Sequence, residues 1–179
     1  MDLARRQLEV NVVGQMRLAQ LVLPAMRANG AGRIINVSSM GGRFAMAFGG
    51  WYHASKYALE ALNDALRQEV SPFGIKVIAI EPGAIRTEWS QVAGRNAALT
   101  SGQGIYSDRA SRMTNVLNRP WMQRLQTNSD RVAKTIIRAI QTEHPRARYV
   151  VGMGARPVLF LRRVLPDRVM DKALALISG

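Results

Sequence analysis

The chain has 179 residues, no cysteine and a formal net charge of +13 at pH 7. Its content of 47% hydrophobic and 21% charged residues is typical of a globular protein and excludes intrinsic disorder. The lack of cysteine excludes disulfide scaffolds, thiol redox chemistry and cysteine-based zinc sites, and with two histidines we expect no metal site. No apolar run reaches the ~20 residues of a membrane span and no signal peptide is visible, so we expect a cytoplasmic protein.

The positive charge is spread along the chain and is not gathered in one block. Arginines such as Arg33, Arg86 and Arg148 lie in quite different local contexts. Nucleic-acid binding is typically indicated by a clustered basic patch. We therefore interpret the charge as a solvated basic surface and expect no nucleic-acid partner.

The first half of the chain alternates between helical and extended patterns. Apolar residues at spacings of three and four predict a helix over 2–28, which Pro24 should kink. A β-branched run predicts a buried strand over 33–38. A pattern with a small-residue face predicts a second helix over 51–71, and another apolar run predicts a strand over 75–80.

The second half opens on a long segment without a clear period. Residues 84–128 are rich in Gly, Asn and Ser and are interpreted as irregular, and loops of such length are typically functional. A third helix follows over 129–142 and a third strand over 147–151. The C-terminal segment 156–179 holds one or two helices, broken near Pro166.

This alternation of helices and strands is typical of the α/β class. We predict an incomplete Rossmann-like, doubly wound parallel sheet of about three strands with flanking helices. Residues 1–179 would form a single partial domain of this kind, because the chain opens on a helix with no strand before it.

Three residues carry the strongest chemical signal. Tyr52 and Lys56 are four residues apart and share one helix face. An ammonium beside a phenol favours the phenolate, so we expect Lys56 to lower the pKa of Tyr52 from about 10 and make it suitable for acid–base catalysis. Ser39 follows the first strand, at the edge where ligands bind in open α/β sheets, and its hydroxyl is placed to hold a substrate oxygen.

Four motifs in a fixed order resemble the short-chain dehydrogenase/reductase family. They are Asn-Val-Val-Gly at 11–14, Asn-Val-Ser-Ser at 36–39, Tyr-x-x-x-Lys at 52–56 and a Pro-Gly motif at 81–87. The resemblance covers about residues 5–90. It implies an NAD(P)-dependent oxidoreductase that interconverts a small-molecule alcohol and ketone by hydride transfer, as a homo-oligomer.

The resemblance also implies roles for individual residues. Tyr52 would be the acid/base, Ser39 would polarise the substrate oxygen, and Lys56 would bind the nicotinamide ribose and tune Tyr52. Asn11 would hold a water in a proton relay. Together with Tyr52 and Lys56, the residues that would contact the cofactor are Pro82, Gly83, Ile85 and Thr87.

Residues 84–128 would form the substrate lid of such an enzyme. Three isolated aromatic residues in this segment, Trp89, Tyr106 and Trp121, either line a hydrophobic substrate pocket or pack between lid and core. The sequence leaves both possibilities open.

Several of these assignments have an alternative. Ser38 could take the place of Ser39, although the thirteen-residue spacing to the tyrosine favours Ser39. Asn11 could only fix a helix kink, and Thr87 could be a helix N-cap. His53 is interpreted as a bystander, because the Tyr–Lys pair already supplies the proton chemistry.

The family's glycine-rich TGxxxGxG turn, its NAD- or NADP-selecting residue and its NNAG motif do not occur in these 179 residues. That turn and the helix after it hold the pyrophosphate of the dinucleotide. We therefore expect a C-terminal portion of a longer dehydrogenase, with roughly 90 residues upstream, that alone binds NAD or NADP weakly or not at all and is inactive. One alternative is a natural short form. Another is a non-catalytic interaction module that pairs with an intact paralogue through its 2–28 and 51–71 helices.

The C-terminal segment 156–179 interleaves basic with apolar residues. A basic amphipathic helix can lie on an anionic membrane surface. It can also cover a substrate cleft, with arginine stems packed along apolar side chains. We favour the second reading.

Overall fold

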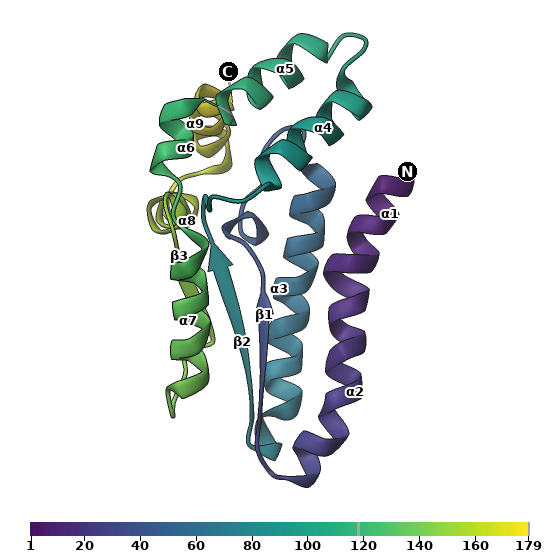
Figure 1. Ribbon diagram of the computed structural model, residues 1–179, viewed down its shortest axis with the longest axis vertical. Helices are drawn as coiled ribbons and strands as arrows, with labels where there is room; N and C mark the ends of the chain where they lie inside the picture. The colour runs from purple at the N-terminus through teal and green to yellow at the C-terminus, as the bar shows by residue number, and fades with distance from the viewer. Residues whose placement is uncertain (118, 179) are drawn as a thin grey trace.

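The computed structural model describes residues 1–117 and 119–178 (Figure 1). Its three strands, β1 (Gly32–Val37), β2 (Ile75–Pro82) and β3 (Arg148–Val151), form one parallel sheet in the order β1-β2-β3. The central strand is buried at all but its second and last residues, which explains its apolar run over 77–80. The α/β class and the partial parallel sheet predicted from the sequence are confirmed.

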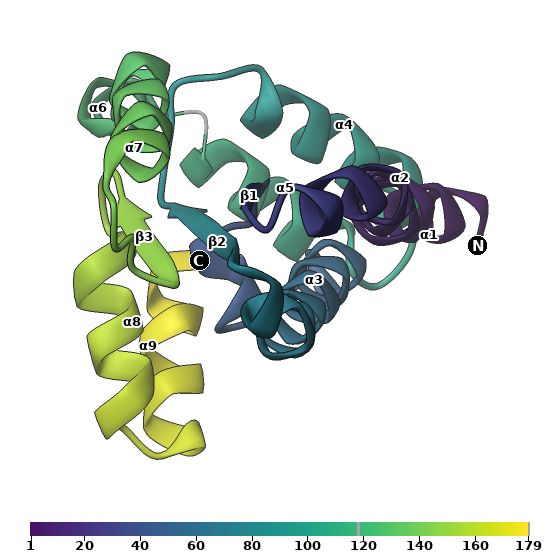
Figure 2. The same cartoon turned by 90° about the horizontal axis from the view of Figure 1, so that it is seen from below.

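Helices cover both faces of the sheet (Figure 2). One face carries the first long helix, made of α1 (Asp2–Leu8), η1 (Glu9–Val13) and α2 (Gly14–Ala28), together with α3 (Gly50–Val70). The opposite face carries α7 (Ser129–Gln141). A doubly wound arrangement follows, with one apolar cluster on each side of the sheet.

The two apolar clusters draw on alternate residues of the same strands. The cluster under α2 and α3 contains Ala19, Ile34, Val70, Ile75 and Val77. The cluster under α7 contains Ile78, Ile80, Ala139 and Val151. Since both sides of β2 are filled, the sheet is rigid at the end where its strands point.

The first helix departs from the sequence expectation in one respect. Its α pattern is interrupted by a π-helical turn at Glu9–Val13, whereas Pro24 lies inside α2, which continues to Ala28. The helix continues through Pro24 to Ala28, and the kink expected at the proline stays a prediction. The π turn instead surrounds Asn11, whose side chain bonds to α3.

Residues 84–128 are largely helical, which corrects the expectation of an irregular segment. They contain α4 (Trp89–Ser101), α5 (Ser107–Leu117) and α6 (Pro120–Leu125). Proline at the first position of α6 is a favourable helix start. Large apolar side chains of this segment are exposed, among them Leu99 in α4 (79%) and Ile105 in the turn between α4 and α5 (89%).

Four short elements complete the fold. They are η2 (Met40–Gly42), η3 (Ser71–Phe73), α8 (Ala155–Val164) and α9 (Asp167–Ser178). The gap between α8 and α9 includes Pro166, which confirms the predicted break. None of the described helices is both long enough and apolar enough to cross a membrane.

Candidate active site

The sequence-predicted residues gather at the carboxyl end of the sheet (Figure 1). Ser39 comes two residues after β1, and Pro82 is the last residue of β2. Tyr52 and Lys56 lie in the first two turns of α3, whose start is beside these strand ends. This is the edge at which ligands bind in open α/β sheets.

The side chains of Ser39 and Tyr52 are in direct contact. The Ser39 hydroxyl forms a hydrogen bond with the Tyr52 side chain. Ser39 also caps η2, where its Oγ accepts the N–H of Gly41 at 3.0 Å. The Oγ of Ser38 is buried without a hydrogen-bond partner among the described residues. The geometry thus favours Ser39 over Ser38.

The pKa of Tyr52 differs from the sequence expectation. Burial raises it above its ordinary value of 10.0, and the hydrogen bond from Ser39 lowers it only in part. Lys56 does not offset this rise in the pKa of Tyr52. Its Nζ donates to the backbone oxygen of Val37 at 3.0 Å. Burial also lowers the pKa of Lys56 itself, against the opposing field of Glu60. The expected lowering of the pKa of Tyr52 by Lys56 is therefore wrong for this structure.

Asn11, in the π turn of the first helix, contacts the turn of α3 that holds Tyr52 and Lys56. Its Nδ2 donates to the Oγ of Ser55 at 3.0 Å, and that hydroxyl donates to the backbone oxygen of Tyr52 at 2.7 Å. Ser55 is fully buried. The π turn is the feature that presents Asn11 to α3, and π turns are frequent at functional sites.

The segment after β2 is tightly packed against the start of α8. A Cβ at Gly83 would meet the backbone oxygen of Met153 and lie 3.0 Å from the Cβ of Ala155. Ile85 lies against Gly152, where its Cδ1 would be 2.7 Å from an added Cβ. These contacts fix the path of the chain that leaves the sheet.

Four further predicted residues lie in the segment that follows β2. Thr87 is exposed and lies two residues before α4. Tyr106 is 56% exposed. The side chains of Trp89 and Trp121 lie outside what the structure describes, so the alternatives for these aromatics stay open.

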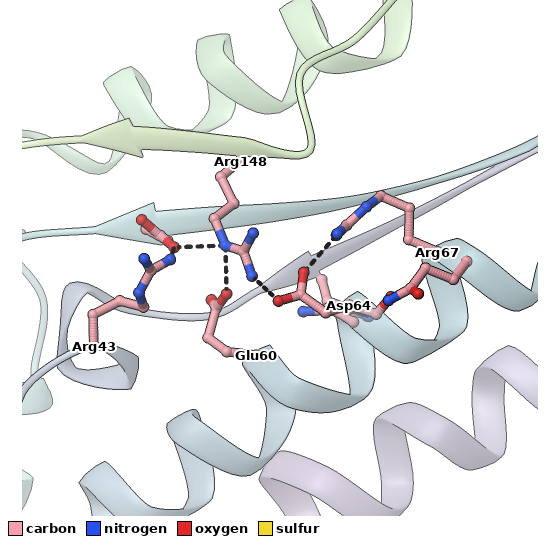
Figure 3. A network of polar contacts seen from close by, with 9 residues as sticks. Arg43, Glu60, Asp64, Arg67 and Arg148 are labelled. Atoms are coloured by element: carbon pink, nitrogen blue, oxygen red, sulfur yellow. Dashed lines mark hydrogen bonds and ion pairs between the residues drawn. The ribbon is translucent and has the colours of Figure 1, made fainter. Parts of the chain in front are cut away.

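An ion-pair network that the sequence did not reveal lies on the α3 side of the site (Figure 3). Arg148 contacts Glu60 at 3.0 Å, Asp64 at 2.6 Å and Glu81 at 3.2 Å. Arg43 contacts Glu81 at 3.3 Å. The network therefore joins β3, α3, the end of β2 and the loop after η2.

Charge repulsion inside this network is balanced by its arginines. Burial and the nearby Glu60 raise the pKa of Glu81, against the pull of Arg43 and Arg148. Burial also acts to raise the pKa of Asp64, but Arg148 and Arg67 hold it below its ordinary value. In the sequence, this network is indicated only by the four-residue spacing of Lys56 and Glu60. Its central arginine, Arg148, is far away along the chain.

The residues present fit the nicotinamide–ribose end of a dinucleotide. An ammonium has three N–H donors, and the backbone oxygen of Val37 takes one of those of Lys56, which leaves two for ribose hydroxyls. Pro82 is the last residue of β2, and Gly83 follows it. A glycine-rich turn for the pyrophosphate does not occur in the 179 residues.

Comparison with known proteins gives a consistent result. A sequence model of the short chain dehydrogenase family matches residues 1–98. YbbO, an uncharacterized oxidoreductase of Escherichia coli (strain K12), is 39% identical over 169 residues, which are 94% of this chain and 58% of that protein. The chain thus spans less than two thirds of the length of this relative.

Solved structures share the same fold. A short-chain dehydrogenase from Streptomyces avermitilis has a TM-score of 0.69 and 31% sequence identity, covering 88% of this chain and 55% of that one. A short chain dehydrogenase from Burkholderia cenocepacia J2315, solved in complex with NADP, has a TM-score of 0.70 and 24% identity, covering 97% of this chain and 59% of that one.

Proposed function

The chain belongs to the short-chain dehydrogenase family, and from this premise we propose that it works in an NAD(P)-dependent interconversion of an alcohol and a carbonyl compound. The observation that carries the proposal is the hydrogen bond between Ser39 and Tyr52, with Lys56 one turn further along α3. The NADP complex of the Burkholderia neighbour supports the choice of cofactor class.

The residues divide the chemistry among themselves. A bound nicotinamide dinucleotide supplies the hydride chemistry. The Ser39 hydroxyl bonds to Tyr52 in this structure and would donate to the substrate oxygen once substrate is bound, while Tyr52 would exchange a proton with that oxygen. Because burial raises the pKa of Tyr52, its phenol is protonated at neutral pH and suited to the reductive direction. Lys56 holds the ribose with the donors that Val37 leaves unused.

The test is Tyr52→Phe in the full-length protein, assayed with NADH or NADPH and a panel of ketones. Removal of a positioned acid typically costs 10²–10⁴-fold in rate, so we expect a loss of at least about 100-fold. Tyr57→Phe, at an exposed position on the next turn of α3, is the control and should keep its rate. Near-normal turnover by Tyr52→Phe would refute the proposal.

Binding of the dinucleotide by these 179 residues alone is proposed to be weak or absent. The support is the missing glycine-rich turn, since that turn supplies the pyrophosphate contacts in dinucleotide folds. Titration of NADH fluorescence with the isolated chain measures it directly. Micromolar affinity would contradict this part of the proposal.

Residues 84–128 are proposed to be the substrate lid. Their two ends are held together, because the N–H of Thr127 donates to the oxygen of Ala84 at 3.0 Å and that of Arg86 to the oxygen of Thr127 at 2.9 Å. The segment that contains α4, α5 and α6 therefore begins and ends near the carboxyl end of β2. Substrate and cofactor together should slow limited proteolysis within this segment, and an unchanged cleavage rate would argue against a lid.

A second candidate role is self-association or pairing with a related dehydrogenase. The outer face of α2 exposes apolar residues at spacings of three and four, and that of α3 exposes small ones. These residues are Leu18, Leu21 and Val22 on α2, and Ala54, Ala61 and Ala65 on α3. Size-exclusion chromatography distinguishes the cases, since a Leu18→Glu/Leu21→Glu variant should turn a dimer into a monomer. A wild-type monomer would exclude self-association.

A further inference from the structure

His53 fills the space between Tyr52 and the turn that follows Ser39. It is 7% exposed, and its ring centroid lies 5.5 Å from that of Tyr52 and 5.8 Å from that of Phe44. Its Nδ1 lies 2.9 Å from the carbonyl oxygen of Gly41. Because a carbonyl can only accept, Nδ1 carries the proton of this hydrogen bond. The position of the imidazole is thus fixed by packing, and its orientation is fixed by the hydrogen bond to Gly41.

Two glycines border the imidazole and leave it no lateral freedom. A Cβ at Gly41 would lie 2.9 Å from Nδ1 of His53 and 3.2 Å from Cε1 of Tyr52. A Cβ at Gly49 would lie 3.0 Å from Cδ2 of the same imidazole. The close approach shows that the turn is shaped to the ring.

The peptide groups around Gly41 connect His53 to Ser39. The carbonyl of Gly41 accepts from the imidazole, while its N–H donates to the Oγ of Ser39 at 3.0 Å. A hydroxyl has one proton to donate. The Oγ of Ser39 accepts from Gly41 and is also hydrogen-bonded to Tyr52. This bond lowers the pKa of Tyr52, which is the effect of a hydrogen bond donated by Ser39 to the phenolate.

We propose that His53 is a positioning residue, which holds the Ser39 hydroxyl on Tyr52 through the backbone of Gly41. The sequence alone indicated a bystander, because the Tyr–Lys pair already supplies the proton chemistry. This positioning role matters for catalysis only under the proposed function, on which the proposal rests in that respect. The hydrogen bond itself can be measured without turnover, so failure of one does not mean failure of the other.

The experiment measures the pKa of the Tyr52 phenol in the intact chain by NMR. Tyrosine labelled with ¹³C at Cζ gives one resonance per ring, and the chain has four tyrosines, so Tyr52→Phe assigns the signal. The bond from Ser39 lowers the pKa of Tyr52, so Ser39→Ala should move the titration of that resonance to higher pH. His53→Phe keeps an aromatic ring but loses the N–H, and we expect a shift in the same direction.

A double variant separates positioning from simple packing. If His53 acts through Ser39, Ser39→Ala/His53→Phe should shift Tyr52 no further than Ser39→Ala alone. His53→Asn should restore much of the wild-type titration, because its amide nitrogen takes the place of Nδ1. His144→Phe, at the exposed second histidine, should leave Tyr52 unchanged.

Two results would overturn the proposal. One is a folded His53→Phe protein whose Tyr52 titrates as in the wild type, even if it melts earlier. The other is a double variant with additive shifts. Should the Phe variant not fold, His53→Asn and His53→Gln decide the question, since the Gln amide lies farther out, near the place of Nε2. Only Gln should then shift Tyr52, and equal behaviour of the two would refute the proposal.

Discussion

Arg148 on β3 and Glu60 on α3, 88 residues apart in sequence, are joined by an Nε–Oε2 contact of 3.0 Å. The side chain of Glu60 is 6% exposed and that of Arg148 is 25% exposed. The same guanidinium contacts Glu81, whose side chain is 2% exposed. One cation therefore compensates two buried carboxylates from different elements.

Removal of this cation should destabilise the fold strongly. Arg148→Met leaves Glu60 and Glu81 buried without their shared partner, and loss of one member of a buried pair typically costs ~3–5 kcal/mol. We expect a loss of about 3 kcal/mol in the free energy of unfolding, because the arginine is partly exposed. Urea denaturation measures it.

The matched control for this variant is Arg67→Met. Arg67 contacts Asp64 of the same network at 2.6 Å, but both side chains are more than 30% exposed, at 33% and 39%. Exposed pairs contribute about 0–1 kcal/mol. Equal losses in the two variants would mean that burial does not set the strength of the network.

The network also makes stability depend on pH in a defined direction. The pKa of Glu81 is raised by burial and by Glu60 above its ordinary value of 4.5. A group with a raised pKa binds more protons in the folded state, so its contribution to stability falls as pH rises from about 4.5 through the folded pKa. Glu81→Gln removes this titration. The stability of the variant relative to the wild type should therefore increase with pH.

Urea denaturation at intervals between pH 4.5 and 7.5 tests this sign. Asp64 titrates in both proteins, so its contribution cancels in the comparison. Its own pKa is lowered, despite burial, by Arg148 and Arg67, and its stabilisation is lost only as pH falls below its ordinary value of 3.8. A stability of the variant relative to the wild type that decreases with rising pH would contradict the assignment.

Gly83 should not tolerate a side chain. A Cβ there would meet the backbone oxygen of Met153, which cannot move without displacing the turn before α8. Overpacking of this kind costs about 1–3 kcal/mol, and we expect Gly83→Ala to lie at the upper end. Thermal unfolding followed by circular dichroism is a suitable measurement.

Gly50, the first residue of α3, offers the opposite case. No atom lies within 4 Å of an added Cβ at this position. Alanine there reduces the entropy of the unfolded chain, so Gly50→Ala should be neutral or stabilising by up to about 1 kcal/mol. Destabilisation by Gly50→Ala would show that chain flexibility before Tyr52 is required.

The hydrogen bond between Asn11 and Ser55 should be detectable as an energetic coupling. Asn11→Ala and Ser55→Ala each remove it, and a typical intramolecular hydrogen bond contributes about 1 kcal/mol. The double variant should therefore lose less stability than the sum of the single ones. Ser71→Ala, at an exposed serine, is the control. Strict additivity would mean that the contact carries no stability.

Much of the fold was predictable because apolar runs and helical periods mark it. The strand β2 contains an apolar run over 77–80, and the alternation of helices and strands indicated a parallel α/β sheet. The candidate residues Ser39, Tyr52 and Lys56 were predicted from their spacing. Each of these patterns is local in the sequence, so it can be recognised without knowledge of the tertiary structure.

What the sequence did not reveal depends on distant partners. Arg148 meets α3 only because β3 lies beside β2 in the sheet, so no spacing rule indicates the contact. The three helices of residues 84–128 escaped prediction, since they bury too few large apolar residues to show a period. Burial likewise decides the pKa of Tyr52, and burial is a property of the folded chain.

The π turn at Glu9–Val13 has a consequence for how the first helix could have arisen. A π turn takes in one residue more than an α turn, and one residue corresponds to a rotation of about 100° around an α-helix. The turn is therefore equivalent to a single-residue insertion absorbed without breaking the helix. Deletion of one residue there would leave a regular helix, but the side chains ahead of the deletion would turn to a different face. In evolutionary terms, Asn11 and the packing face of α2 can be kept together only as long as this irregular turn is kept.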